Sequence, residues 1–133
     1  MAASGFFNAS LFVAAGGAVG AWARYSTGVV LGRWGAITAQ FPWPTLAVNV
    51  IGSLLMGLLA GWLARHGSGG EGWRLLLGVG ALGGFTTFSA FSLELALMIE
   101  RGNLASAATY VGVSVIAGVA ALFAGLTIMR VAA

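Results

Sequence analysis

Near the middle of its third apolar stretch the chain reads Gly83-Gly84-Phe85-Thr86-Thr87-Phe88-Ser89-Ala90-Phe91-Ser92. Glycines and hydroxyl side chains are unusual in a segment expected to lie in hydrocarbon. Backbone that leaves the helix inside a bilayer is tolerated only where protein or a wet cavity surrounds it. We expect such a break at the Gly-Gly pair followed by Thr-Thr, and Phe88 and Phe91, three residues apart, share a helix face beyond it. The sequence therefore predicts a functional site inside the third span.

The overall composition is that of a membrane protein. The chain has 133 residues, of which 59% are hydrophobic and 7% charged, and its mean hydropathy is +0.98. These values exclude an ordinary soluble domain. The basic residues are all Arg and form no cluster, so nucleic acid is not an expected partner. The absence of Cys excludes disulfides and thiolate metal sites.

Four spans follow from the need for about 20 apolar residues to cross the hydrocarbon core. We expect them at about 7–32, 44–64, 73–99 and 104–129, forming a single four-helix transmembrane domain over residues 1–133. The predicted fold class is an all-α membrane protein whose third helix is broken near its middle. Pro44 suits the first turn of the second helix, where its missing N–H is not needed.

The Arg residues give almost no signal for orientation. Four spans place both termini on one side of the membrane. That side has Arg65, Arg74 and Arg130, and the other has Arg33, Arg101 and, if its side chain snorkels outward, Arg24. Because an excess of positive charge normally fixes the cytoplasmic side, this near balance leads to the hypothesis that the protein inserts both ways up. The alternative is one orientation set by a small bias.

Polar side chains recur at helical spacing inside the spans. These are Thr45, Asn49 and Ser53 on the second span, Ser106, Tyr110 and Ser114 on the fourth, and Thr87, Ser89 and Ser92 around the Phe rings of the third. Residues four apart lie on one helix face. Such residues commonly form interhelical hydrogen bonds, but aligned stripes on several helices favour a lined pathway. A close-packed bundle of four helices has no lumen, so the pathway is narrow or built by an oligomer.

Ionisable groups inside the spans are few. Glu94 is the only acid well inside a span, and an intramembrane acid is a functional candidate by default. For Arg24, snorkelling and a functional role are both open. The only His, His66, lies in a Gly-rich loop without the partners that a metal site or a catalytic triad needs. We therefore do not expect an enzyme.

The solute that these residues suit is a small anion. The spans carry no ring of acids of the kind that cation channels use, and they offer amide and hydroxyl donors. The edge of an aromatic ring is the positive end of its quadrupole, so paired Phe edges can face an anion without a fixed charge that would trap it.

Three stretches resemble the signature segments of the Fluc (CrcB) fluoride channels. They are residues 16–25 (Gly-Gly-Ala-Val-Gly-Ala-Trp-Ala-Arg-Tyr), 45–53 (Thr-Leu-Ala-Val-Asn-Val-Ile-Gly-Ser) and 83–92. The resemblance extends to length, span count and spacing. It implies an antiparallel dual-topology homodimer in a bacterial inner membrane, surrounded by lipid. Its two pores would passively export fluoride and confer fluoride resistance.

The resemblance also implies roles for individual residues. Fluoride would meet the ring edges of Phe88 and Phe91 and the amide donor of Asn49, and Thr45 lies one turn from that amide. Tyr110 and Ser114 align with a polar track on the fourth helix, where Gly118 stands in place of a common hydroxyl. Further pore candidates are Ser89, Glu94 and Arg24. The backbone carbonyls of Gly83 and Thr86 would hold a central structural Na⁺ ion.

One alternative class is a small, dual-topology, proton-coupled multidrug exporter. Such an exporter needs a membrane acid to carry its proton. The candidate here is Glu94 on the third span, whereas that class places the acid on the first. A non-transporting membrane scaffold would explain the glycines but not the polar stripes.

Overall fold

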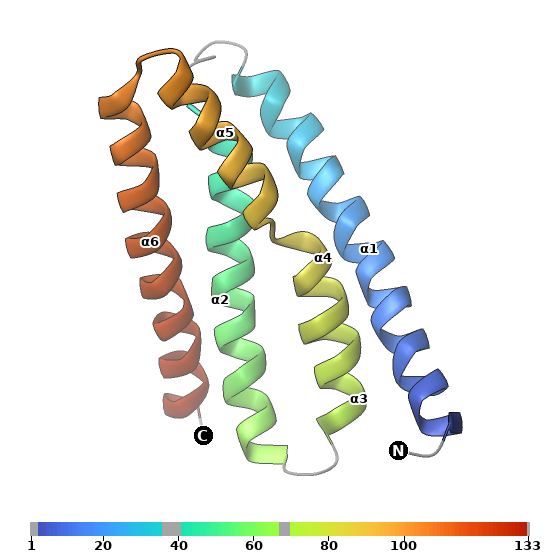
Figure 1. The fold of residues 1–133 in the computed structure, drawn as a ribbon. Coiled ribbons are helices and arrows are strands. Elements are labelled where there is room, and N and C mark those ends of the chain that lie inside the picture. The colour runs from blue at the N-terminus through green and yellow to red at the C-terminus, as the bar shows by residue number, and fades with distance from the viewer. Residues whose placement is uncertain (1–2, 36–40, 67–69, 133) are drawn as a thin grey trace.

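The computed structural model describes residues 3–35, 41–66 and 70–132, and in these residues all regular structure is helical. Figure 1 shows the arrangement of the helices. In chain order they are α1 (Ala3–Gly35), α2 (Trp43–His66), α3 (Glu71–Trp73), the π-helical segment η2 (Arg74–Leu82), α4 (Gly83–Phe85), α5 (Phe88–Glu100) and α6 (Leu104–Val131).

Four helical stretches are long and apolar enough to cross a membrane, as predicted. They are α1, α2, the run from α3 to α5, and α6, and each extends slightly beyond its predicted limits. A short turn joins α5 to α6, where Gly102 has a φ of 75°, a left-handed conformation that glycine adopts without steric strain.

The spans pack as two parallel pairs (Figure 1). One pair is α1 with η2 and α4, and the other is α2 with α6. Along the second pair, Ser53 lies beside Gly118 and Gly57 against the Leu122 carbonyl, so contacts advance in the same direction on both helices. Glycines at both contacts let the backbones approach closely. Gly28 and Gly32 of α1, by contrast, have no such neighbour among the described residues.

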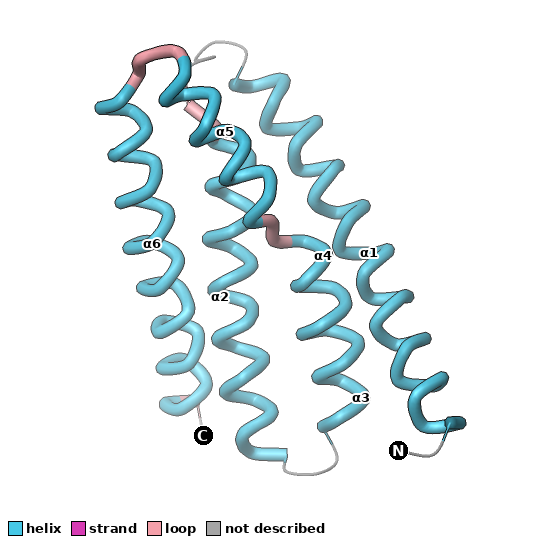
Figure 2. Tube along the Cα trace, viewed as in Figure 1, coloured by secondary structure: helices cyan, strands magenta, loops and turns pink. Residues whose placement is uncertain are grey.

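The third span is interrupted at two residues. Thr86 (φ −81°, ψ 157°) and Thr87 (φ −150°, ψ 121°) have extended backbones between α4 and α5, seen as a loop in Figure 2. The span as a whole is bent by only 17°, so the interruption changes its hydrogen bonding more than its direction.

The sequence predicted an interruption over the Gly-Gly pair and the Thr-Thr pair that follows it, and in the structure only the two threonines are extended. Gly83 has ordinary helical angles (φ −63°, ψ −37°), and it belongs with Gly84 to α4. Gly84 serves close packing, because a Cβ there would lie 2.6 Å from the Gly17 carbonyl oxygen of α1.

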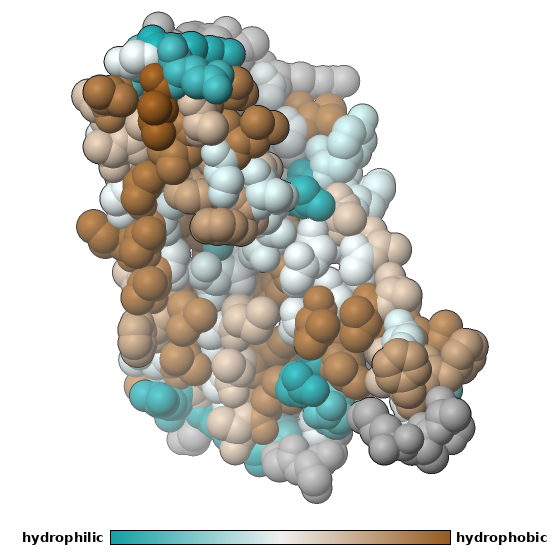
Figure 3. All heavy atoms as spheres, in the orientation of Figure 1, coloured by the Kyte–Doolittle hydropathy of each residue, from teal (hydrophilic) through white to brown (hydrophobic). Residues whose placement is uncertain are grey.

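The outer surface is strongly apolar. Large hydrophobic side chains such as Val19, Ile116 and Phe123 are more than half exposed. In the face shown in Figure 3, hydrophilic side chains gather mainly at the two ends of the molecule and hydrophobic ones cover much of the length between them. A surface of this kind needs lipid around it, which agrees with an integral membrane protein that crosses the membrane several times.

Candidate functional site

Asn49 of α2 holds the interruption of the third span. Its Oδ1 accepts from the Thr87 N–H at 2.8 Å, and its Nδ2 donates to the Thr87 carbonyl at 3.1 Å. One amide side chain thus satisfies both polar groups of an extended residue that has no strand beside it, a requirement that hydrocarbon makes strict. The remaining Nδ2 proton is the only part of this amide left for another acceptor.

The side-chain bonds at the interruption divert two backbone donors. In a continuous helix the Gly83 carbonyl would accept from Thr87 N–H, and the Thr86 carbonyl from Ala90 N–H. Here Thr87 N–H donates to Asn49, and Ala90 N–H donates to the Thr87 hydroxyl at 3.2 Å. The two carbonyls proposed as sodium ligands therefore both lack their helical donors.

Arg24 of α1 also acts at the interruption. Its Nε donates to the Gly84 carbonyl at 3.1 Å, across a sequence separation of 60 residues. That carbonyl is at the end of α4, where the helix leaves its last acceptors without donors. A cation is also favourable at this end of a helix. Arg24 is half-buried, so snorkelling alone does not describe it.

Glu94 of α5 is held by hydroxyl groups from two other spans. Thr45 donates to its Oε1 at 2.6 Å and Tyr110 to its Oε2 at 2.7 Å. Tyr110 is fully buried and belongs to the core cluster of Leu46, Met98 and Ala107. Thr45 and Tyr110 have one O–H each, so both of these protons are directed at the Glu94 carboxyl.

The two Phe rings have different surroundings. Phe91 packs against Tyr110 with ring centroids 4.9 Å apart, and Phe88 lies 5.7 Å from Phe91. The side chain of Phe88 is 79% exposed within the protomer. The rings are adjacent as predicted, but only Phe91 is supported by the protomer's own core.

The polar stripes of α2 and α6 face each other. Ser53 lies beside Gly118, with 3.5 Å between the Ser53 hydroxyl and a Cβ built at Gly118. One turn back on both parallel helices, this register sets Asn49 level with Ser114. The Ser114 hydroxyl is buried and has no hydrogen-bond partner in the described part of the chain. It is the kind of unpaired polar group that calls for water or a ligand.

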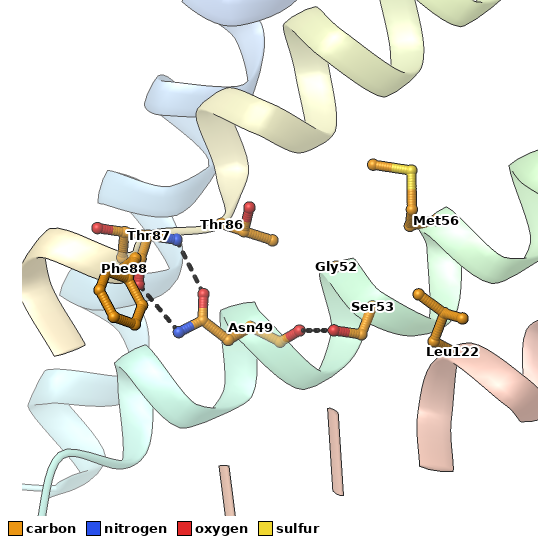
Figure 4. A pocket seen from close by; sticks show the side chains of 8 residues that line it. All are labelled: Asn49, Gly52, Ser53, Met56, Thr86, Thr87, Phe88 and Leu122. Atoms are coloured by element: carbon orange, nitrogen blue, oxygen red, sulfur yellow. Dashed lines mark hydrogen bonds between the residues drawn. The ribbon is translucent and has the colours of Figure 1, made fainter. Parts of the chain in front are cut away.

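An open groove of about 290 Å³ adjoins these residues (Figure 4). It is lined by Asn49, Gly52, Ser53, Met56, Thr86, Thr87, Phe88 and Leu122. In the view of Figure 4, Asn49 and the backbone of Thr87 meet at one end, and Met56 and Leu122 mark the apolar end. The groove joins the exposed Phe88 to the polar stripe of α2.

The predicted site residues thus divide into three groups. Asn49, Arg24, Gly83 and Thr86 meet at the interruption, Thr45, Tyr110 and Glu94 form a hydrogen-bonded cluster, and the Phe pair lies between them. Ser89 is exposed, and its Oγ lies 3.3 Å from the Thr87 hydroxyl. The sequence placed Ser53 and Thr87 on polar stripes but predicted no individual role for either. The spacing of Ser53 with Thr45 and Asn49, and the β-branched pair after two glycines, were the available signals.

The site contains the chemistry of anion and hard-cation contacts. The described residues form no cluster of His, Cys, Asp and Glu able to hold a metal. What the site offers are hydroxyl and amide donors, a guanidinium, and carbonyl oxygens without helical donors. Backbone oxygens are ligands that a small hard cation accepts.

This arrangement places the chain among multi-pass integral membrane proteins with a polar site between their spans. A family model described as "CrcB-like protein, Camphor Resistance (CrcB)" matches residues 11–126. The chain belongs to the CrcB family. Its relatives are bacterial, which indicates the plasma membrane.

Similar proteins carry a common name. The chain is 59% identical over 123 residues to the fluoride-specific ion channel FluC of Novosphingobium aromaticivorans, covering 92% of this chain and 97% of that protein. It is 60% identical over 124 residues to the protein of that name from Phenylobacterium zucineum, with coverages of 92% and 96%. It is also 60% identical over 121 residues to the one from Caulobacter sp. strain K31, with coverages of 90% and 93%.

Proposed function

We propose that this protein is a fluoride-selective channel through which fluoride leaves the cell passively. The observation that carries the proposal is the identity of 59–60%, over at least nine-tenths of the chain, to proteins named fluoride-specific ion channels. The site is consistent with this role, because fluoride is a strong hydrogen-bond acceptor and the site offers amide and hydroxyl donors beside ring edges. Nothing in this role requires catalysis.

The working unit in this proposal is an antiparallel homodimer with two pores. The exposure of Phe88 supports it, because a ring facing an anion needs a second wall that the protomer does not supply. The open groove beside Phe88 is the surface that a second copy would cover. The balanced Arg count is compatible with protomers inserted in opposite orientations.

A structural Na⁺ ion at the centre of the dimer completes the proposal. The carbonyls of Gly83 and Thr86 fit it, because each has lost its helical donor and needs a partner within hydrocarbon. Two protomers would supply four such oxygens. The ion would act by holding the two interruptions together.

The deciding experiment is fluoride efflux from liposomes that contain the purified protein, followed with a fluoride electrode. We expect fast efflux that an imposed proton gradient does not drive. Efflux that depends on a pH gradient would instead indicate a proton-coupled exporter. That class is not favoured, because both oxygens of Glu94 are engaged by Thr45 and Tyr110. Efflux no faster than from empty liposomes would refute both.

A further inference from the structure

The seam between α2 and α6 is polar at one end and closed at the other. Thr45 and Tyr110 converge on Glu94, and Asn49 is level with the unpaired hydroxyl of Ser114. The next level pairs Ser53 with Gly118. Ser53 is therefore the last hydroxyl of the seam, and the position opposite it has no side chain.

Beyond Ser53 the two helices are in backbone contact. A Cβ at Gly57 would collide with the Leu122 carbonyl, and one at Gly125 would lie 2.7 Å from the Leu58 backbone nitrogen. Two backbones with no room for a Cβ between them have none for an ion or a water molecule. An anion that follows the polar seam must leave it at the level of Ser53.

The open groove begins at the same level. Ser53 lines the groove together with Asn49 and Phe88. Beyond Ser53, the groove is lined by the apolar side chains of Met56 and Leu122. We propose that Ser53 is the hydroxyl that passes the anion between the groove and the α2–α6 seam, and that the missing side chain at Gly118 keeps it accessible. This inference rests on the proposed channel function and adds a pore residue to it.

The hydrogen bonding of Ser53 permits this role. Its hydroxyl donates to the Asn49 carbonyl at 2.7 Å. That carbonyl is also the helical acceptor for the Ser53 N–H within α2. The hydroxyl can therefore turn its proton to an anion without leaving the carbonyl unpaired. No proton is transferred, and the contact is a hydrogen bond made and broken as the anion passes.

The test is a rescue experiment in the liposome efflux assay. We expect Ser53→Ala to lower fluoride efflux by about tenfold, the effect of losing one hydrogen bond to a charged group. Adding Gly118→Ser to Ser53→Ala should restore efflux to within about threefold of wild type, because it returns a hydroxyl to the same level of the seam. The matched control adds Gly118→Ala to Ser53→Ala. In the wild type a Cβ at position 118 would lie 3.5 Å from the Ser53 hydroxyl oxygen, which is an ordinary contact. The Ala side chain therefore fits but brings no hydroxyl, so it should not restore efflux.

A second measurement does not depend on the Ala variants. Because the chain has no Cys, Ser53→Cys provides a unique thiol, and a charged water-soluble thiol reagent should modify it and block efflux. Unchanged efflux in Ser53→Ala, equal rescue by Gly118→Ala and Gly118→Ser, or an inert thiol at 53 would each overturn the inference. A wild-type protein without efflux would instead refute the channel function itself.

Discussion

At the residue scale, Asn49 has a structural role that its contacts show and a role in transport that we propose. Both ends of its amide bind the backbone of Thr87. This is the interhelical hydrogen bonding common among polar residues of membrane helices, and it leaves one Nδ2 proton for an anion. The role of Asn49 as a pore donor stays a prediction, which a change in charge can separate from its structural role.

Asn49→Asp keeps the acceptor for the Thr87 N–H but removes the donor to its carbonyl. We expect fluoride efflux to fall by at least about tenfold, because a donor is lost and a carboxylate repels an anion. The measurement is the efflux rate divided by the amount of folded protein. The melting temperature is recorded alongside, as the temperature at which half of the folded peak is lost in size-exclusion chromatography. A lower melting temperature with wild-type efflux would assign Asn49 to structure alone.

The Phe pair should separate packing from transport. Phe88 is 79% exposed within the protomer, so Phe88→Ile should lower the melting temperature less than Phe91→Ile, whose ring packs inside the protomer. Efflux should nevertheless fall sharply, because an aliphatic side chain has no positive edge.

Phe91→Ile is the comparison for Phe88→Ile. It should lower both efflux and stability, because the Phe91 ring packs on Tyr110. Retained efflux and selectivity in both variants would make the rings packing residues only.

At the scale of elements, side chains of neighbouring helices stabilise the interruption of the third span. Asn49 of α2 holds the extended Thr87, Arg24 of α1 binds the end of α4, and Thr87 itself caps α5 through Ala90 N–H. The interruption is thus stabilised from three directions. Glycine contributes through the close packing of α4 against α1.

Two adjacent glycines test this account of α4. Gly84→Ala should destabilise the protein by about 1–3 kcal/mol, because its Cβ would meet the Gly17 backbone of α1 at 2.6 Å. Gly83→Ala should cost less, since within the protomer the nearest atom to its Cβ is the Gly78 carbonyl oxygen at 3.8 Å, and the angles of Gly83 are helical. The stability of both variants is measured by heating the protein and quantifying the remaining folded peak by size-exclusion chromatography. The reverse order of stabilities would show that Gly83 holds the special backbone.

At the scale of the whole molecule, one protomer alone does not cover the surface around its site. The groove is open and the side chain of Phe88, which lines it, is exposed. The nearby Phe91, by contrast, packs against the core cluster around Tyr110. A second copy in the opposite orientation would complete both features. This proposal can be tested without a structure of the dimer.

A single introduced Cys reports the orientation of each protomer. Asn103→Cys is suitable because Asn103 is exposed and its side chain makes no capping bond. We expect a membrane-impermeant thiol reagent to label about half of the protein from either side, since the two orientations are equal in an antiparallel dimer. Labelling from one side only would exclude dual topology.

Removal of sodium tests the proposed central ion. Prolonged replacement of Na⁺ by a bulky organic cation on both sides should abolish efflux or dissociate the dimer, because the carbonyls of Gly83 and Thr86 would lose their partner. Li⁺ and K⁺ serve as size controls. Unchanged efflux and an intact dimer in the organic cation would mean that no structural ion binds there.

The sequence by itself determined the number of spans, their approximate limits and the residues with unusual chemistry. Runs of apolar residues long enough to cross a bilayer leave few alternatives to helices, because each backbone polar group must be paired internally. The polar spacing of Thr45, Asn49 and Ser53 marked one face of α2. These signals are local, so a single sequence suffices to read them.

Only the tertiary structure decided how these residues are paired. The extended residues are Thr86 and Thr87 instead of the glycines, because Gly84 is needed against α1 and Asn49 of another span satisfies Thr87. Glu94 meets Thr45 across 49 residues of sequence, and Ser53 gains its place beside a groove from the register of α2 on α6. Such contacts depend on the positions of several helices at once, and the spacing within any one helix cannot specify them.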